Sequence, residues 1–171
     1  IITQVSTAPW NTKHQLVQIA LQAKTIPTEN LPAGNFVFLI DVSGSMNEPN
    51  KLPLLVASLK MLVDNLRPKD KVAIVTYAGN AGVALASTSA GNKERIKTAL
   101  DALSTYGSTN GAGGIEKAYE IASENFMKNG NNRIILATDG DFNVGMSSDN
   151  DMEKLIEQKR QSGIYLTVLG F

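Results

Sequence analysis

The hydrophobic pattern from residue 35 onward alternates between short continuous apolar runs and longer stretches with helical spacing. The runs at 36–41 and 133–138 predict strands that are buried on both faces of a sheet, and 164–170 predicts a last strand. Leucine and valine recur at helical spacing over 52–66, with Pro53 in the first turn, where a proline removes no helical hydrogen bond. Strands that alternate with helices of this length favour an α/β fold.

The segments between these elements predict a hairpin and three more helices. Strands at 71–77 and 83–87 are joined by a turn-rich link, which is typical of an antiparallel hairpin. Asn92 is predicted to cap one helix, and Asn150 with Glu153 forms a capping box for another. Between them, a helix follows a glycine-rich turn and carries an apolar face of four residues: Ile115, Tyr119, Ala122 and Phe126.

The first part of the chain has a different pattern. Residues 15–23 alternate with period two, which predicts a strand with one buried face. Pro27 and Pro32 then bracket a polar connector. We therefore expect an N-terminal extension and linker at 1–34 and one domain at 35–171. The predicted fold is a doubly wound, mostly parallel α/β sheet with one antiparallel edge strand, plus a short N-terminal β extension.

Composition narrows the range of functions. The 171 residues include sixteen basic and sixteen acidic side chains, so no net charge favours nucleic acid or an anionic membrane. No apolar stretch approaches the roughly 20 residues that span a bilayer. The absence of cysteine excludes disulfides and thiolate metal sites.

Polar side chains follow the predicted buried strands directly. Asp41, Ser43 and Ser45 stand at every second position after 36–40, Asp139 follows the strand at 133–138, and Thr109 lies in the glycine-rich turn. Because ligands of open parallel sheets bind beyond the carboxyl ends of the strands, these groups are predicted to form one site. Hard oxygen donors suit Mg2+, Mn2+ or Ca2+. Two carboxylates are few for a divalent ion, so a coordination position is left for a partner's carboxylate.

The stretch IDVSGSM resembles the DxSxS motif of von Willebrand factor A (vWA) domains, and Thr109 and LATDGD stand where that family has the rest of its metal-ion-dependent adhesion site (MIDAS). The resemblance implies that Ser43, Ser45 and Thr109 offer hydroxyls to the ion and that Asp41 and Asp139 act directly or through waters. Mg2+ is the expected ion, with Mn2+ and Ca2+ as alternatives. Asp141 is not taken as a ligand, because the family's aspartate precedes glycine.

The resemblance also implies a function and a location. It predicts a non-enzymatic adhesion or scaffolding module whose protein partner supplies an Asp or Glu carboxylate. Glycines 111, 113 and 114 are expected to ease a shift of the following helix on binding. The segment PWNTKHQLVQIALQAK resembles a lead-in of bacterial family members, which are commonly exported and lipid-anchored. We therefore expect an extracytoplasmic location, with any membrane link through a lipid anchor outside this fragment. The family usually has one more strand and a helix after the strand at 164–170, and we expect the domain at 35–171 to lack them.

Two alternatives stay open. An aspartyl-phosphate type phosphotransferase or phosphatase would use Asp41 as nucleophile beside Mg2+. Such enzymes usually carry a second aspartate two positions on, where this chain has Ser43, and the sequence identifies no well-placed lysine. A metal-free structural tether is the other alternative. A serine hydrolase is disfavoured, because the one histidine, His14, is distant in sequence and no GxSxG motif is present.

Overall fold

Two compact units make up the chain, Ile1–Leu31 and Pro32–Phe171. The computed structural model describes residues 1–22, 27–78, 81–106, 112–140 and 156–171. The capping box predicted at Asn150 and Glu153 lies outside these residues, although residues 156–160 are helical.

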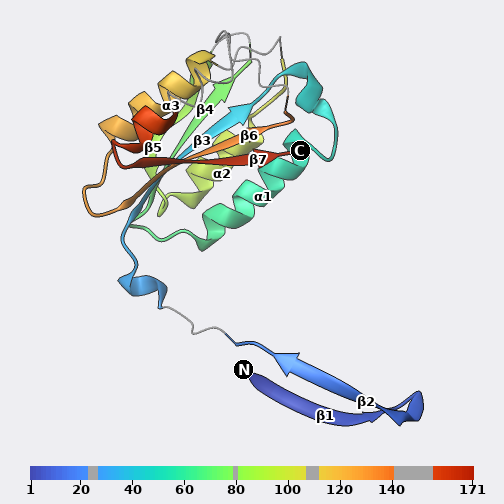
Figure 1. Cartoon of the computed structure of the whole chain (residues 1–171). Coiled ribbons are helices and arrows are strands. Elements are labelled where there is room, and N and C mark those ends of the chain that lie inside the picture. The colour runs from blue at the N-terminus through green and yellow to red at the C-terminus, as the bar shows by residue number, and fades with distance from the viewer. Residues whose placement is uncertain (23–26, 79–80, 107–111, 141–155) are drawn as a thin grey trace. The chain divides into compact units, whose positions relative to one another are not determined.

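A five-stranded sheet forms the centre of the larger unit, with strand order β5-β4-β3-β6-β7 (Figure 1). Neighbouring strands are parallel except for the antiparallel pair of β4 and the edge strand β5. The chain moves from β3 to one side and later to the other side, so the strand order reverses at β3. This confirms the predicted doubly wound sheet. Its strands are β3 (Gly34–Asp41), β4 (Lys71–Tyr77), β5 (Ala81–Ser89), β6 (Asn131–Thr138) and β7 (Ile164–Gly170).

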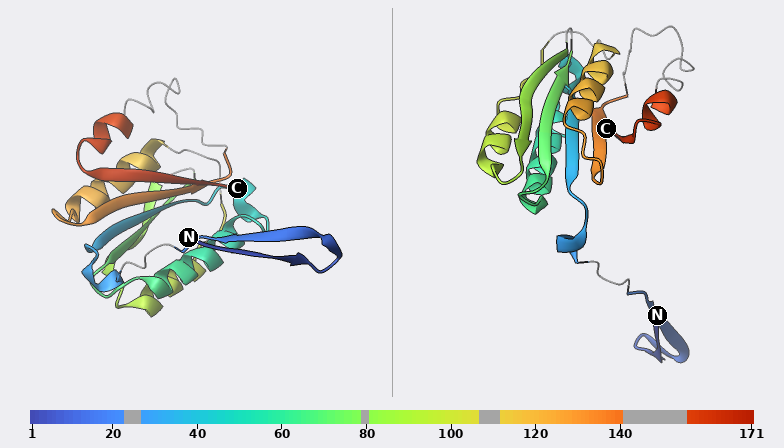
Figure 2. Two further views of the ribbon diagram at one scale, coloured as in Figure 1. Left: turned by 60° about the horizontal axis from the view of Figure 1, so that its bottom comes forward. Right: turned by 90° about the vertical axis from the view of Figure 1, so that its left-hand side faces the viewer.

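Helices cover both faces of this sheet (Figures 1 and 2). Helices α1 (Leu52–Asn65) and α2 (Lys93–Asp101) pack on one face, and α3 (Ala112–Glu124) packs on the other. Asn92 is the N-cap residue of α2, but its side chain makes no capping hydrogen bond. The predicted apolar face of α3 is wrong at Phe126, which lies beyond the helix and is 43% exposed.

Strand β3 shows why its sequence is a continuous apolar run. Phe38 and Ile40 contribute to the core beneath α1 and α2, whereas Val37 and Leu39 contribute to the core beneath α3. All four side chains are fully buried. A central strand with both faces covered needs apolar residues at every position, so its pattern does not alternate.

Asp70 ties the amino end of β3 to the turn that precedes β4. Its carboxylate accepts hydrogen bonds from the Gly34 amide at 2.8 Å and from the Arg67 amide and guanidinium at 2.7 to 3.0 Å. The Asp70 side chain is 2% exposed. A carboxylate buried to this degree needs such partners, because an unpaired buried charge is strongly destabilising.

The smaller unit is a hairpin of β1 (Ile2–Ala8) and β2 (Asn11–Ala20), followed by the 3-10 turn η1 (Thr28–Asn30). The predicted strand is confirmed, but its predicted buried face is wrong. Val17 is 58% exposed and Ile19 is 66% exposed. The alternation defines an apolar face correctly, but a two-stranded sheet provides no second layer to cover it. Among the described residues, no helix is long and apolar enough to cross a membrane.

Candidate metal centre

Asp41 ends β3 and is fully buried at the carboxyl edge of the sheet. Its Oδ1 accepts a hydrogen bond from the Ser43 amide at 2.8 Å. Its Oδ2 accepts from the Tyr77 hydroxyl at 3.2 Å and from the Thr138 hydroxyl at 3.4 Å. Both donors come from the ends of the strands on either side of β3. The carboxylate is therefore fixed in orientation by the sheet itself.

Tyr77 is suited to this role because it stays protonated. Burial, together with the nearby Asp41 carboxylate, raises the pKa of the Tyr77 phenol far above its ordinary value. A phenol that keeps its proton remains a hydrogen-bond donor at every pH at which the protein is folded. Sequence reasoning missed both Tyr77 and Thr138. Their signal is positional, since each ends a strand that pairs with β3.

Two serine hydroxyls meet in the loop after β3. The Oγ atoms of Ser43 and Ser45 lie 3.1 Å apart. The loop turns tightly here, because the amide of Met46 donates to the Ser43 carbonyl at 3.0 Å at the start of the 3-10 helix η2 (Gly44–Asn47). Met46 is fully buried beneath the turn and anchors it to the core. Ser45 remains exposed.

Asp139 follows β6 and faces an unexpected partner, Lys51. The Lys51 ammonium donates to Asp139 Oδ2 and to the Ser45 carbonyl oxygen, each at 2.9 Å. The Ser45 carbonyl and the Asp139 carboxylate are therefore separated by no more than twice that distance. No motif or pattern singles out this lysine among the sixteen basic residues. Its place directly before α1, in the segment that closes the Ser43–Ser45 loop, is the signal that could have identified it.

Four of the five predicted ligands are thus joined by a chain of contacts: the Ser43 amide to Asp41, the Ser43 hydroxyl to the Ser45 hydroxyl, and the Ser45 carbonyl through Lys51 to Asp139. The fifth, Thr109, lies outside the described residues, as does Asp141. Within the described part of the chain, no group of three or more His, Cys, Asp or Glu side chains could hold a metal. An ion at this edge would depend on serine hydroxyls as well as carboxylates, a donor set that fits hard divalent cations.

Comparison with known proteins identifies the family of this chain. The family model for the von Willebrand factor type A domain matches residues 35–171. The chain belongs to the von Willebrand factor type A domain family. An Escherichia coli (strain K12) protein described as uncharacterized, YfbK, is 48% identical over 167 residues, which are 98% of this chain and 29% of that protein. The chain therefore spans less than a third of the length of this relative.

Solved structures share the vWA fold. A von Willebrand factor type A structure from Catenulispora acidiphila matches with a TM-score of 0.67 and 23% identity, over 81% of this chain and 33% of that one. Proximal thread matrix protein 1 from the mussel byssus, in a structure with a zinc-occupied MIDAS motif, matches with a TM-score of 0.62 and 27% identity. That match covers 82% of this chain and 36% of the byssus protein.

Gly114 packs α3 of the vWA domain closely against the residue that holds Asp41. A Cβ atom at Gly114 would lie 2.9 Å from Tyr77 Cβ and 3.1 Å from Tyr77 Cγ. At Gly113 the nearest atom would be the Ala81 Cβ, at an ordinary contact distance of 3.8 Å. Glycine at 114 therefore permits close helix–strand packing, and the expected role of these glycines in a helix shift stays a prediction. Gly111 lies outside the described residues.

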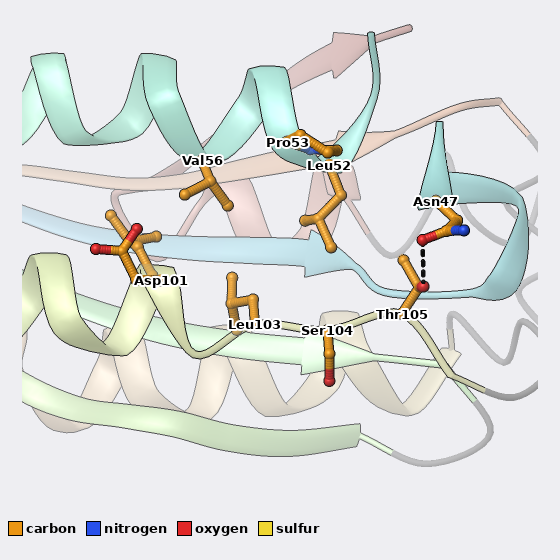
Figure 3. Close-up of a pocket in the computed structure, with 9 residues that line it drawn as sticks. Asn47, Leu52, Pro53, Val56, Asp101, Leu103, Ser104 and Thr105 are labelled. Atoms are coloured by element: carbon orange, nitrogen blue, oxygen red, sulfur yellow. Dashed lines mark hydrogen bonds between the residues drawn. The ribbon is translucent and has the colours of Figure 1, made fainter. Parts of the chain in front are cut away.

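A groove of about 500 Å3 lies between the start of α1, the end of α2 and the loop of the metal centre (Figure 3). Leu52, Val56 and Leu103 form its apolar part, and the Thr105 hydroxyl donates to Asn47 Oδ1 at 3.2 Å at one end. Of the four predicted ligands that the structure describes, none lines this groove.

Proposed function

We propose that this vWA domain is a metal-dependent protein-binding module. Asp41, Ser43, Ser45, Thr109 and Asp139 would hold a divalent cation at the carboxyl edge of the sheet. The observation that carries the proposal is the continuous set of contacts that joins four of these residues across two loops. Asp41 ends β3 and Asp139 follows the parallel strand β6, so both stand at the carboxyl edge of the sheet, where open α/β sheets bind their ligands.

The predicted ligands would have different roles. Asp41 is buried and hydrogen-bonded on both oxygens, so it would orient the Ser43 loop and supply negative charge to the site. The Ser43 and Ser45 hydroxyls, whose Oγ atoms lie 3.1 Å apart, would be direct ligands. The bound cation would act as a Lewis acid that accepts an Asp or Glu carboxylate from a partner protein.

Mg2+ is the proposed ion, with Mn2+ and Ca2+ as alternatives, because every donor is a hard oxygen. The comparisons support a divalent cation in general, since the byssus protein carries zinc at its MIDAS motif. Zinc therefore belongs in the set of ions to be titrated.

An enzyme of the aspartyl-phosphate type is the less favoured alternative. Lys51 supplies a lysine at the site, but its ammonium contacts Asp139 rather than Asp41. Asp41 is fully buried and both of its oxygens accept hydrogen bonds, which is unsuited to nucleophilic attack on a phosphate ester. Hydrolysis of p-nitrophenyl phosphate with Mg2+ tests this alternative. Turnover that disappears in Asp41→Asn would favour the enzyme over the binding module.

The binding proposal is tested with an array of peptides in matched pairs that differ only in Asp or Glu against Asn or Gln. Wild-type protein with Mg2+ or Mn2+ is expected to select acidic members, and a chelator or Asp41→Asn should abolish that selection. Selection that persists in excess chelator would contradict the proposed mechanism. No ion-induced heat or thermal shift with any of the four cations would favour the metal-free tether.

We further propose that 35–171 is the functional domain, that 1–34 is an extension and linker, and that the protein works outside the cytoplasm. The location rests on the resemblance of the lead-in segment to exported bacterial members of the family. A periplasm-specific reporter fused to the full-length natural protein tests the location. An expressed fusion without reporter activity would contradict it.

A further inference from the structure

Lys51 connects the two loops that carry the proposed metal ligands. Its ammonium lies 2.9 Å from Asp139 Oδ2 and 2.9 Å from the Ser45 carbonyl. The Asp139 side chain is only 5% exposed, whereas that of Lys51 is 22% exposed. The Asp139 carboxylate is thus nearly buried, and the Lys51 ammonium reaches it from the solvent side on a flexible side chain.

Lys51 lies among acidic side chains. Its ammonium donates a hydrogen bond to Asp139 at 2.9 Å, and the carboxylates of Glu48 and Asp41 also interact with this charge. A cationic side chain therefore sits beside the Asp139 carboxylate. A divalent cation that uses Asp139 would need the space and the negative charge that Lys51 now uses.

We propose that Lys51 is an intramolecular counter-cation of the metal centre, which neutralises Asp139 in the metal-free protein and competes with the divalent cation for it. This inference rests on the proposed metal-binding function. It assigns Lys51 two opposing effects, since the side chain stabilises the metal-free fold and lowers the affinity for the ion. On metal binding, the flexible four-carbon stem allows the ammonium to withdraw from Asp139 toward solvent.

Burial distinguishes this ion pair from the other lysine pairs of the molecule. Lys60 pairs with Asp101 at 2.8 Å, but that carboxylate is 54% exposed. Exposed pairs of this kind contribute little to stability, because water already solvates both charges. A nearly buried Asp139 depends much more on its cation. Lys60→Met is therefore a matched control for Lys51→Met: it removes the same charge and the same kind of contact, away from the metal loops.

Mn2+ titration, followed by the electron paramagnetic resonance of the free ion, tests the proposal. Lys51→Met is expected to bind Mn2+ roughly tenfold more tightly than wild type, since a like charge beside the site is removed. Lys60→Met should bind as wild type does. Lys51→Arg keeps the charge and can bind the carboxylate through two N–H groups, so its Mn2+ affinity should equal or fall below that of wild type.

A second readout does not depend on metal. In chelator, Lys51→Met should lower the urea midpoint of unfolding, and this loss should disappear in an Asp139→Asn background, where no charge needs compensation. Unchanged or weaker Mn2+ binding by Lys51→Met, tighter binding by Lys51→Arg, or an equal loss of stability in both backgrounds would overturn the counter-cation role. Absence of Mn2+ binding by wild type and every variant would instead overturn the metal centre itself. If Lys51→Met does not fold, the Lys51→Arg affinity and the double variant decide the question.

Discussion

A comparison of two buried tyrosines measures how much the hydrogen bond that orients Asp41 contributes to stability. The Tyr77 hydroxyl donates to the buried Asp41 carboxylate. Tyr119 is equally buried, but its hydroxyl has no hydrogen-bond partner among the described residues. We predict that Tyr77→Phe lowers the free energy of unfolding by about 1.5 to 3 kcal/mol, the range for hydrogen bonds to charged groups. Urea denaturation measures this loss.

Tyr119→Phe is the matched control, since it removes the same atom from the opposite environment. Deleting an unsatisfied buried hydroxyl should leave stability unchanged or slightly higher. Equal losses in both variants would mean that the Tyr77–Asp41 hydrogen bond has no special weight. This contrast depends on the hydrogen bonds of two single hydroxyl groups.

At the scale of elements, the contact between α3 and β4 depends on Gly114. We predict that Gly114→Ala destabilises the protein by about 1 to 3 kcal/mol, because the added methyl group meets the Tyr77 side chain at 2.9 Å. The displacement of Tyr77 should also weaken metal binding, which Mn2+ titration would detect. Gly113→Ala, with an ordinary contact at 3.8 Å, should be neutral or stabilising. A destabilisation that is as large at Gly113 would show that the helix start, and not the tyrosine contact, is responsible.

Asp70, which joins the start of β3 to the turn before β4, makes the free energy of unfolding depend on pH. Burial alone would raise the pKa of Asp70, but hydrogen bonds from Arg67 and from the Gly34 amide outweigh it and hold the pKa below its ordinary value. A carboxyl group whose pKa is lower in the folded state stabilises the protein at pH values above its unfolded-state pKa of about 4. This stabilisation is lost as the pH falls through the folded-state pKa.

Asp70→Asn is therefore expected to lower the free energy of unfolding by about 2 to 4 kcal/mol at neutral pH. The difference from wild type should shrink as pH falls below roughly 4. Urea denaturation across this range measures it. The control is Asp101→Asn, whose carboxylate is 54% exposed and which should change stability by less than about 0.5 kcal/mol. A difference between Asp70→Asn and wild type that does not change with pH would contradict this origin.

For the whole molecule, the two units place apolar side chains in opposite environments. Val17 on the hairpin is 58% exposed, whereas Val37 in β3 is fully buried. Val17→Thr should change the free energy of unfolding by less than about 0.5 kcal/mol, whereas Val37→Thr should lower it by about 1 to 3 kcal/mol. Thermal and urea unfolding of the two variants provide the comparison. A large loss in Val17→Thr would mean that the apolar face of the hairpin is covered.

The sequence predicted the sheet well because its strands are marked by local patterns. The apolar runs at β3 and β6, and the alternation at 15–23, define strand positions without knowledge of the fold. The sequence also predicted Asp41, Ser43 and Ser45 as ligands, because they stand where a buried strand ends, and this stays a prediction. It could not identify Lys51 or Tyr77, because their roles come from contacts between segments distant in sequence. For the same reason it could not show that the apolar face of the hairpin is exposed.

The most direct test of the metal centre is Mn2+ binding by wild type, Ser43→Ala and Ser58→Ala. Ser43 is a proposed ligand, whereas Ser58 lies on the exposed side of α1, where its hydroxyl donates to the Leu54 carbonyl. Wild type and Ser58→Ala are predicted to bind one Mn2+ per chain with equal affinity, and Ser43→Ala should bind at least about tenfold more weakly. Equal binding by all three proteins, or no binding by wild type, would contradict a metal centre at the end of β3.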